Sequence, residues 1–194
     1  FDLSYLSMMP NMTVLAPKND RELEEMLVFA VSFDGPIAIR YPRGSAHQGL
    51  REYQAPVEYG RSEIIRKGKK IAVLGVGSMI PSCMEICKGL KDDGYDPTFV
   101  NARFVKPLDV DLLDELAKDH SLFVTVEENV KSGGYGEHVS AYMEACHPEI
   151  RVLSAAVWDR FVPQGNVESL RSRIGLGVED IRQAIEDSEE LREQ

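Results

Sequence analysis

Arg43 is the residue of this sequence whose position most favours ligand binding. It ends the stretch 34–43, in which a Gly-Pro turn precedes a short alternating strand pattern over residues 37–41. Pro42 cannot donate a ladder hydrogen bond and holds the preceding residue extended, so the strand must end before Arg43. In parallel α/β sheets, ligands bind outside the carboxyl ends of the strands, where a guanidinium group suits phosphate or carboxylate. The alternative is a structural ion pair, and this stretch alone favours that alternative.

Two adjacent carboxylates, Glu127 and Glu128, follow a continuous apolar run and precede the glycine-rich turn at 133–136. Such a pair could act as general acid and base, or could bind a metal ion. Neighbouring residues of a strand point to opposite faces, however, so the two carboxylates cannot share one site without a bulge. We therefore expect a structural role, in which one of them accepts hydrogen bonds from the backbone amides of the glycine turn.

The other candidate motifs are incomplete. Gly75 and Gly77 follow a predicted strand, but the third glycine and the acidic residue of a dinucleotide-binding loop are missing. Cys83 and Cys87 lie one helical turn apart without a second pair or a suitably spaced histidine, so they do not form a zinc site. The histidines are scattered and have no nucleophile or acid at motif spacing. The residues alone therefore predict no catalytic constellation.

Composition restricts the class of protein. The net charge of -10 argues against nucleic acid as the main partner, because binding to a phosphate backbone requires a basic stripe. No apolar run approaches the ~20 residues of a membrane span, and we expect no signal peptide. Cysteines without paired spacing indicate a reducing compartment. The sequence starts in mid-pattern without a methionine, and we expect it to be a piece of a longer protein.

The first part of the chain predicts a strand–helix–strand unit that leads to Arg43. A short apolar strand is expected over residues 12–16, followed by a helix that Asn19 caps, with Glu22 reaching back in a capping box. The inner face of that helix is expected to hold Leu23, Met26, Leu27 and Ala30. Residues 46–59 are polar and turn-forming without sustained periodicity, so they predict a linker that contains a domain boundary.

Residues 60–194 predict a second α/β domain, with a mostly parallel sheet covered by helices on both faces. Segments 60–66 and 71–76 flank a basic turn and predict a hairpin that feeds a buried strand. Ser78 is expected to cap the next helix. The inner face of that helix is expected to hold Met79, Cys83, Ile86, Cys87 and Leu90.

Further along, strands and helices continue to alternate. Strands are expected over 98–101, 122–126 and 152–157, with helices beginning near Asp109 and at Glu137 between them. An acidic amphipathic tail from Val178 onward predicts a closing helix that frays near its end. Trp158 and Phe161 follow the last strand and indicate a packed loop or an interface patch, since aromatic residues anchor interfaces.

A series of motifs runs in order along nearly the whole chain. They are MPNMTVLAPK at 9–18, GPIAIRYPRG at 35–44, RFVKPLD at 103–109, VTVEEN at 124–129, GGYG at 133–136 and FVPQG at 161–165. The series resembles the C-terminal part of the 1-deoxy-D-xylulose-5-phosphate synthase family, within the transketolase superfamily. The motif at 41–44 together with that at 103–109 points to this family rather than to its sister families.

The resemblance implies a domain organisation and an activity. Residues 1–45 would be the C-terminal end of a pyrimidine-binding α/β domain, 46–59 a linker, and 60–194 a transketolase C-terminal domain. The whole protein would use thiamine diphosphate and Mg²⁺ to condense pyruvate with D-glyceraldehyde 3-phosphate, giving 1-deoxy-D-xylulose 5-phosphate and CO₂ for isoprenoid, thiamine and pyridoxal synthesis. Arg43 matches the arginine that holds the phosphate of the acceptor.

The same resemblance implies no catalytic residue, cofactor-binding residue or metal ligand within this chain, because the corresponding family motifs lie upstream. We expect the chain alone to be inactive, to form a homodimer, and to have no nucleic-acid or membrane partner. Its location would be cytoplasmic in a bacterium or the plastid stroma in a plant.

Two alternatives remain. One is another thiamine-diphosphate enzyme, such as transketolase or the β subunit of a 2-oxo-acid dehydrogenase. The other is a free-standing oligomerisation or anion-binding α/β domain, which a natural start codon just before Phe1 would favour.

Overall fold

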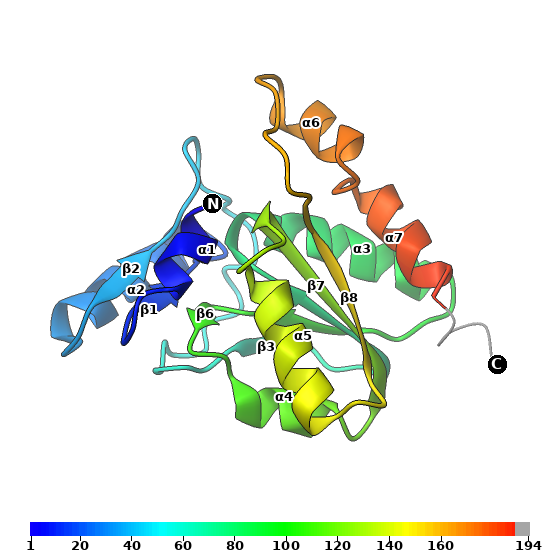
Figure 1. Ribbon diagram of the computed structural model, residues 1–194, viewed down its shortest axis with the longest axis horizontal. Helices are drawn as coiled ribbons and strands as arrows, with labels where there is room; N and C mark the ends of the chain where they lie inside the picture. The colour runs from blue at the N-terminus through cyan, green and yellow to red at the C-terminus, as the bar shows by residue number, and fades with distance from the viewer. Residues whose placement is uncertain (189–194) are drawn as a thin grey trace.

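The computed structural model describes residues 1–188, which form two β-sheets and the helices that cover them (Figure 1). The helices are α1 (Asp2–Ser7), α2 (Asp20–Ser32), α3 (Ile80–Asp92), α4 (Val110–Leu116), α5 (Tyr135–Cys146), α6 (Val167–Arg173) and α7 (Val178–Glu186), with a short 3-10 turn, η1 (Gly77–Met79). The strands are β1 (Thr13–Leu15), β2 (Ile37–Ile39), β3 (Glu63–Arg66), β4 (Lys70–Gly75), β5 (Thr98–Asn101), β6 (Phe104–Lys106), β7 (His120–Val130) and β8 (Arg151–Val157). The expected α/β class is confirmed.

The larger sheet has the strand order β3-β5-β4-β7-β8. Strands β5, β4, β7 and β8 are parallel, and β3 pairs antiparallel with β5 at one edge. Side chains of β4 alternate between the two faces, with Val73 packed on one side and Leu74 on the other. Each face is therefore covered by its own apolar cluster, as expected of a mostly parallel sheet.

Helices α3 and α7 lie side by side over one face of this sheet, and α4 and α5 contribute to the cluster on the other face (Figure 1). The inner face predicted for α3 is confirmed, because its five expected residues are all buried. The closing helix is also confirmed as α7, whose Ile181 and Ile185 pack into the same cluster. The expected fraying near the end of the chain lies outside the described residues.

The predicted hairpin between segments 60–66 and 71–76 is wrong, because β5 lies between β3 and β4. The basic turn packs onto the segment that leads into β5 instead of closing a two-stranded ladder. The amide of Lys69 donates to Asp96 O at 2.6 Å, and a Cβ on Gly68 would lie 2.1 Å from that same oxygen. Both ladder edges of β4 are occupied by parallel neighbours, which leaves no edge for β3.

The smaller sheet has the order β2-β1-β6 and joins the two ends of the sequence. Strands β1 and β2 are parallel, whereas β6 comes from the later part of the chain and pairs antiparallel with β1. The amide of Ala16 also donates to Arg103 O at 2.9 Å. Residues on either side of the segment 46–59 thus share one sheet.

Helix α2 is capped as predicted, since Asn19 Oδ1 accepts from the amide of Glu22 at 2.8 Å. The second half of the capping box is wrong, because the Glu22 carboxylate accepts from the Lys18 amide and ammonium and not from the amide of the cap. The predicted inner face is also displaced, since Met26 is buried but Leu27 is 51% exposed. The buried stripe follows Glu22, Met26 and Phe29, because the charged Glu22 turns inward to meet cations there.

A buried cluster of charged and amide side chains lies where α2, β3 and the β5–β6 connection meet. Its members are Lys18, Glu22, Glu63, Asn101 and Arg103, all of them buried. Lys18 Nζ lies 2.9 Å from Glu22 and 2.7 Å from Glu63. Arg103 contacts both carboxylates and also donates to the carbonyls of residues 55 and 56. The cluster therefore fixes part of the irregular segment 46–59 against both neighbouring parts of the chain.

Candidate anion-binding site

A pocket of about 820 Å³ lies near the carboxyl ends of β2, β4 and β7, beside α6. The side chains of its wall that carry charge or hydrogen-bonding groups and enter the argument below are Lys18, Arg40, Arg43, Ser78, Glu128 and Arg171. α/β sheets bind ligands at the carboxyl ends of their parallel strands, and several positively charged side chains line the pocket at these ends.

Arg43 lies in the wall of this pocket, as its position after a strand end predicts. Strand β2 ends at Ile39, two residues earlier than the sequence pattern indicates, so Arg43 stands on the loop beyond it. Within residues 1–188 its side chain is exposed and has no ion-pair or hydrogen-bond partner. A structural ion pair, the alternative considered for this residue, is absent from that part of the chain. Its guanidinium donors are thus available to an anion.

Arg40 is a second guanidinium of the pocket, and sequence reasoning missed it. Its Nη1 donates to Ser78 Oγ at 3.2 Å, and its Nη2 donates to the main-chain oxygen of Glu128 at 3.2 Å. The only signal in the sequence is its place at the end of the same strand pattern that carries Arg43.

Ser78 does not cap a helix, which corrects the expectation for that residue. Val76 precedes the 3-10 turn η1 and makes no side-chain capping bond. The Ser78 hydroxyl instead donates to Glu128 Oε2 at 2.8 Å and accepts from Arg40. Ser78 therefore connects the end of β4 to those of β2 and β7.

Glu128 brings a negative charge into the pocket, and Arg171 of α6 contacts it directly. Arg171 Nη2 lies 2.8 Å from Glu128 Oε2. Burial tends to raise the pKa of Glu128, but the hydrogen bonds from Arg171 and Ser78 outweigh burial and hold that pKa below its usual range. Glu128 is therefore ionised at neutral pH. Its ion-pair partner, Arg171, was not among the candidate residues of the sequence analysis.

Glu127 points the other way, as the alternation along a strand predicts. Its carboxylate accepts from the amides of Tyr135 at 3.0 Å and Gly136 at 2.8 Å, so the expected structural role at the glycine turn is confirmed. Burial raises the pKa of Glu127 to about 7, against the opposing effect of these two amides. A Cβ on Gly134 would lie 2.6 Å from the same carboxylate, which explains the glycine there. The two glutamates do not form an acid–base pair.

The other sequence candidates carry no site in the described residues. Cys83 and Cys87 are buried among apolar side chains, and burial raises the pKa of both thiols, to about 12 for Cys87. Within residues 1–188, no group of three or more His, Cys, Asp or Glu side chains could hold a metal ion. No helix in that part of the chain is long and apolar enough to cross a membrane.

Trp158 and Phe161 are exposed, at 61% and 87% of their surface. Phe161 contacts the ring of Phe1 with centroids 5.7 Å apart, and Lys131 Nζ lies 4.9 Å from the centre of the Trp158 ring. This loop returns to the start of the chain, and its aromatic residues remain available at the surface.

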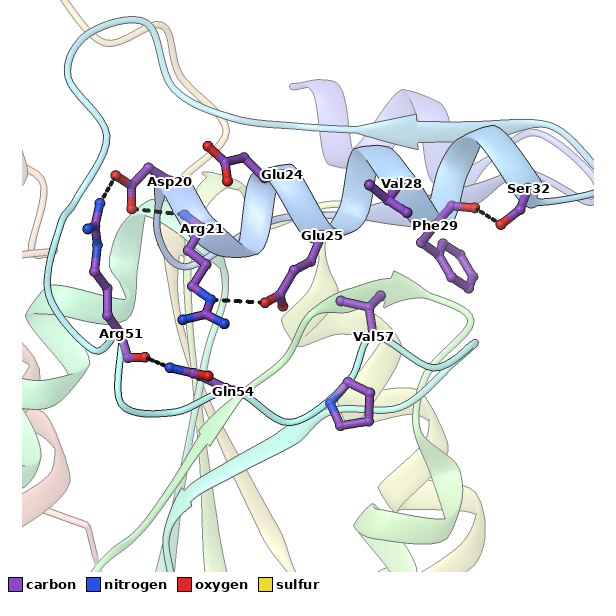
Figure 2. Close-up of a pocket in the computed structure, with 11 residues that line it drawn as sticks. Asp20, Arg21, Glu24, Glu25, Val28, Phe29, Ser32, Arg51, Gln54 and Val57 are labelled. Atoms are coloured by element: carbon purple, nitrogen blue, oxygen red, sulfur yellow. Dashed lines mark hydrogen bonds and ion pairs between the residues drawn. The ribbon is translucent and has the colours of Figure 1, made fainter.

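A second hollow, of about 940 Å³, lies between α2 and residues 51–57 (Figure 2). Its apolar side includes Phe29 and Val57, but both of its arginines are already in ion pairs. Arg21 lies 3.2 Å from Glu25, and Arg51 contacts the carboxylate of Asp20. This hollow offers less to an anion than the pocket around Arg43 does.

The fold is that of an α/β protein of the transketolase type. The family model described as "Transketolase, C-terminal domain" matches residues 60–181, and "Transketolase, pyrimidine binding domain" matches residues 1–48. The chain belongs to the transketolase C-terminal domain family.

The curated relatives are more specific than the family. The chain is 45% identical over 182 residues to the 1-deoxy-D-xylulose-5-phosphate synthase of Lachnoclostridium phytofermentans. The aligned region covers 93% of this chain and 29% of that protein. The chain is 41% identical over 186 residues to the enzyme of the same name from Dictyoglomus thermophilum, covering 95% of this chain and 30% of the relative. The expected resemblance is confirmed. The chain spans less than a third of the length of these relatives.

Among solved structures, the fold matches one titled "Split gene transketolase, inactive beta4 tetramer" with a TM-score of 0.90 at 27% identity. The match covers 98% of this chain and 61% of that one. Both parts of the present chain therefore find their counterparts, in the same arrangement, in one transketolase chain.

Proposed function

We propose that this chain is the C-terminal part of a 1-deoxy-D-xylulose-5-phosphate synthase and supplies the site for the acceptor's phosphate. The whole protein would condense pyruvate with D-glyceraldehyde 3-phosphate to 1-deoxy-D-xylulose 5-phosphate and CO₂. Two relatives at 45% and 41% identity carry that name, and their similarity extends over almost all of this chain. This chemistry supplies precursors of isoprenoids, thiamine and pyridoxal.

The observation that carries the proposal is the guanidinium of Arg43, which has no partner within residues 1–188 and lies in a pocket at the strand ends. A planar fork of donors matches two oxygens of a phosphate group, and such charge-assisted bonds are stronger than neutral ones. Arg40 lies in the same wall and adds positive charge to it. The acceptor substrate is a phosphate ester, whereas pyruvate is not. Arg43 would therefore act on the second half of the reaction.

We propose the domain limits expected from the sequence, namely 1–45 for the end of the pyrimidine-binding domain, 46–59 for the linker and 60–194 for the C-terminal domain. The family models support these limits, with matches that end at residue 48 and resume at residue 60. The pocket lies where the parts meet, because Arg43 comes from the first and Glu128 from the last.

The proposed reaction uses thiamine diphosphate and Mg²⁺. No group of acidic, cysteine or histidine side chains in residues 1–188 could hold a metal ion. We propose that both are bound by other parts of the protein and that this chain alone is inactive. The split-gene transketolase structure that the present chain resembles is titled an inactive β4 tetramer.

The proposed partner is a second copy of the protein, in the cytoplasm of a bacterium. The exposed aromatic rings of Trp158 and Phe161 support an interface on this chain. Light scattering that finds a monomer at every concentration would contradict a homodimer held through these residues.

The test of the proposed function is the substitution Arg43→Ala in the full-length protein. Losing one charged phosphate contact should cost about 2–3 kcal/mol of acceptor binding. The KM for D-glyceraldehyde 3-phosphate should rise accordingly, while CO₂ release from pyruvate on the cofactor stays unchanged. An acceptor KM equal to that of the unsubstituted enzyme would overturn the role of Arg43.

Product analysis with the same two substrates distinguishes the alternatives. Formation of 1-deoxy-D-xylulose 5-phosphate supports the synthase. Failure to form it, with activity toward other ketose donors or 2-oxo acids, would indicate a transketolase or a 2-oxo-acid dehydrogenase.

A further inference from the structure

Glu128 poses an electrostatic problem for an anion pocket. It is the one carboxylate among the described residues that line the pocket, and its charge would repel a phosphate group. Its pKa lies below the usual range, so protonation does not remove that charge at neutral pH. Another group must offset it if the pocket is to bind a dianion.

Two of the pocket's cations are poorly placed to offset it. Lys18 lies in the wall, but its ammonium is held between the buried carboxylates of Glu22 and Glu63. Arg40 donates to Ser78 and to the main-chain oxygen of Glu128, so its charge acts on the Glu128 carboxylate only at a distance and less than Arg171 does. Arg171 alone among the described residues makes an ion pair with the carboxylate, at 2.8 Å.

Arg171 comes from a helix that has little else to hold it at the pocket. Helix α6 has seven residues and none of them is buried. It stands beyond the end of the larger sheet (Figure 1). Asn166 caps the N-terminus of α6, because its side chain accepts a hydrogen bond from the amide of Ser169. The ion pair between Arg171 and Glu128 therefore connects α6 to the strand ends. Val167 and Arg171 are the residues of α6 that line the pocket.

We propose that Arg171 is the counter-ion of Glu128 and thereby sets the charge of the pocket to suit a phosphate ester. The inference rests on the proposed function, in which Arg43 binds the acceptor's phosphate. Arg171 is then a specificity-determining residue that acts through Glu128 and need not touch the ligand. The pair would join α6 to the site, and α6 would carry part of the acceptor preference.

The charges around the pocket make this role specific. Three guanidinium groups, those of Arg40, Arg43 and Arg171, line the pocket together with one carboxylate, and this leaves two net positive charges for a phosphate monoester dianion. Without Arg171 the pocket loses one of these charges, and Glu128 is left unpaired toward the ligand. Replacing Glu128 with glutamine as well restores the balance, because Arg40 and Arg43 remain. A direct contact between Arg171 and the ligand would not be restored in this way.

The experiment titrates inorganic phosphate into the 194-residue chain at constant ionic strength, with binding followed by NMR chemical shifts. R171A should weaken phosphate binding by about tenfold, because an unpaired charge acts strongly in a partly desolvated site. R171K, which keeps the charge, should stay within about threefold of the unsubstituted chain. R173A is the matched control, since Arg173 lies on the same helix but is not part of the pocket wall, and it should change binding by less than about twofold.

The double variant E128Q/R171A decides between a counter-ion and a direct ligand. Recovery to within about threefold of the unsubstituted chain supports the proposal, since the two changes then compensate as coupled residues do. A double variant as weak as R171A overturns it, and so does an R171A no weaker than R173A. R43A separates this proposal from the one on which it rests. Binding lost in R43A but kept in R171A defeats only the counter-ion, whereas binding unaffected in R43A, or absent from the unsubstituted chain, defeats both.

Discussion

Two adjacent glutamates show how strongly surroundings decide what a residue does. Glu127 turns into the protein and holds the glycine turn through two backbone amides. Glu128 turns toward the pocket and meets Arg171 and Ser78. Burial acts to raise both pKa values, but only Glu128 has a guanidinium close enough to reverse that effect. The first is thus a structural group, and the second is a charged group in the wall of the pocket.

The raised pKa of Glu127 predicts a pH-dependent stability that its amide variant should lack. A carboxyl group whose pKa rises from 4.5 to about 7 on folding binds its proton more tightly in the native state. Its contribution is full below pH 4.5 and is lost as the pH rises through about 7, by ~3 kcal/mol in total. Urea unfolding at a series of pH values should show this fall in the unsubstituted chain and a flatter profile in Glu127→Gln.

The control is Glu137→Gln, which changes an exposed carboxylate bonded to the same glycine turn. It should leave the difference between low and neutral pH unchanged. Equal profiles for Glu127→Gln and the unsubstituted chain would show that Glu127 titrates at its ordinary pKa.

At the scale of elements, the buried charge cluster is what connects α2, β3 and the β5–β6 connection. Two cations and two carboxylates balance within it, and Asn101 donates to both carboxylates. Burial acts to raise the pKa of Glu63, but the hydrogen bond from Lys18 and the charge of Arg103 hold that pKa below 4.5. A cluster of this kind contributes little net stability over apolar packing, yet removing one member leaves an uncompensated buried charge.

Arg103→Met should accordingly destabilise the chain by about 3–5 kcal/mol, because Glu22 and Glu63 both lose a partner in a desolvated site. The matched control is Arg61→Met, which breaks the ion pairs of a half-exposed arginine with Asp109 and Asp111 and should cost no more than about 1 kcal/mol. Denaturant unfolding measures both. A loss for Arg103→Met as small as that for Arg61→Met would mean that the buried carboxylates find other partners or take up protons.

Local signals predicted the elements well and the long-range contacts poorly. The opposite directions of Glu127 and Glu128, the Asn19 cap and the inner face of α3 depend on neighbours within a few residues, and these predictions are confirmed. The hairpin failed because strand pairing is decided by which edges remain free, and no local pattern shows that β5 occupies the edge of β4. Arg171 was missed because it meets Glu128 from 43 positions away, through a helix whose own sequence carries no binding signal. That Arg43 binds the acceptor's phosphate stays a prediction.

At the scale of the whole molecule, the two parts named by the family models are physically one structure in the described residues. Strand β6 of the later part completes the sheet of the earlier part. The apolar cluster on one face of the larger sheet includes Leu3, Val14 and Ala16 together with residues of β4 and α5. The pocket wall, in turn, draws on both parts. A substitution in the core of either part should therefore affect the pocket, because the two parts share one continuous core.

This continuity predicts one cooperative unfolding transition instead of two. Amides of β1 should exchange with solvent by the same global opening as those of β4 and β7, since one core supports all three strands. Val14→Ala, a truncation at a fully buried position, should lower that common free energy by about 1–3 kcal/mol for both sets of amides. Val31→Ala is the control, because Val31 is 90% exposed and its loss should change the free energy by less than about 0.5 kcal/mol. Native-state hydrogen exchange measures each set separately. An earlier opening confined to residues 1–45, with Val14→Ala affecting only that segment, would show that the shared sheet does not couple the two parts.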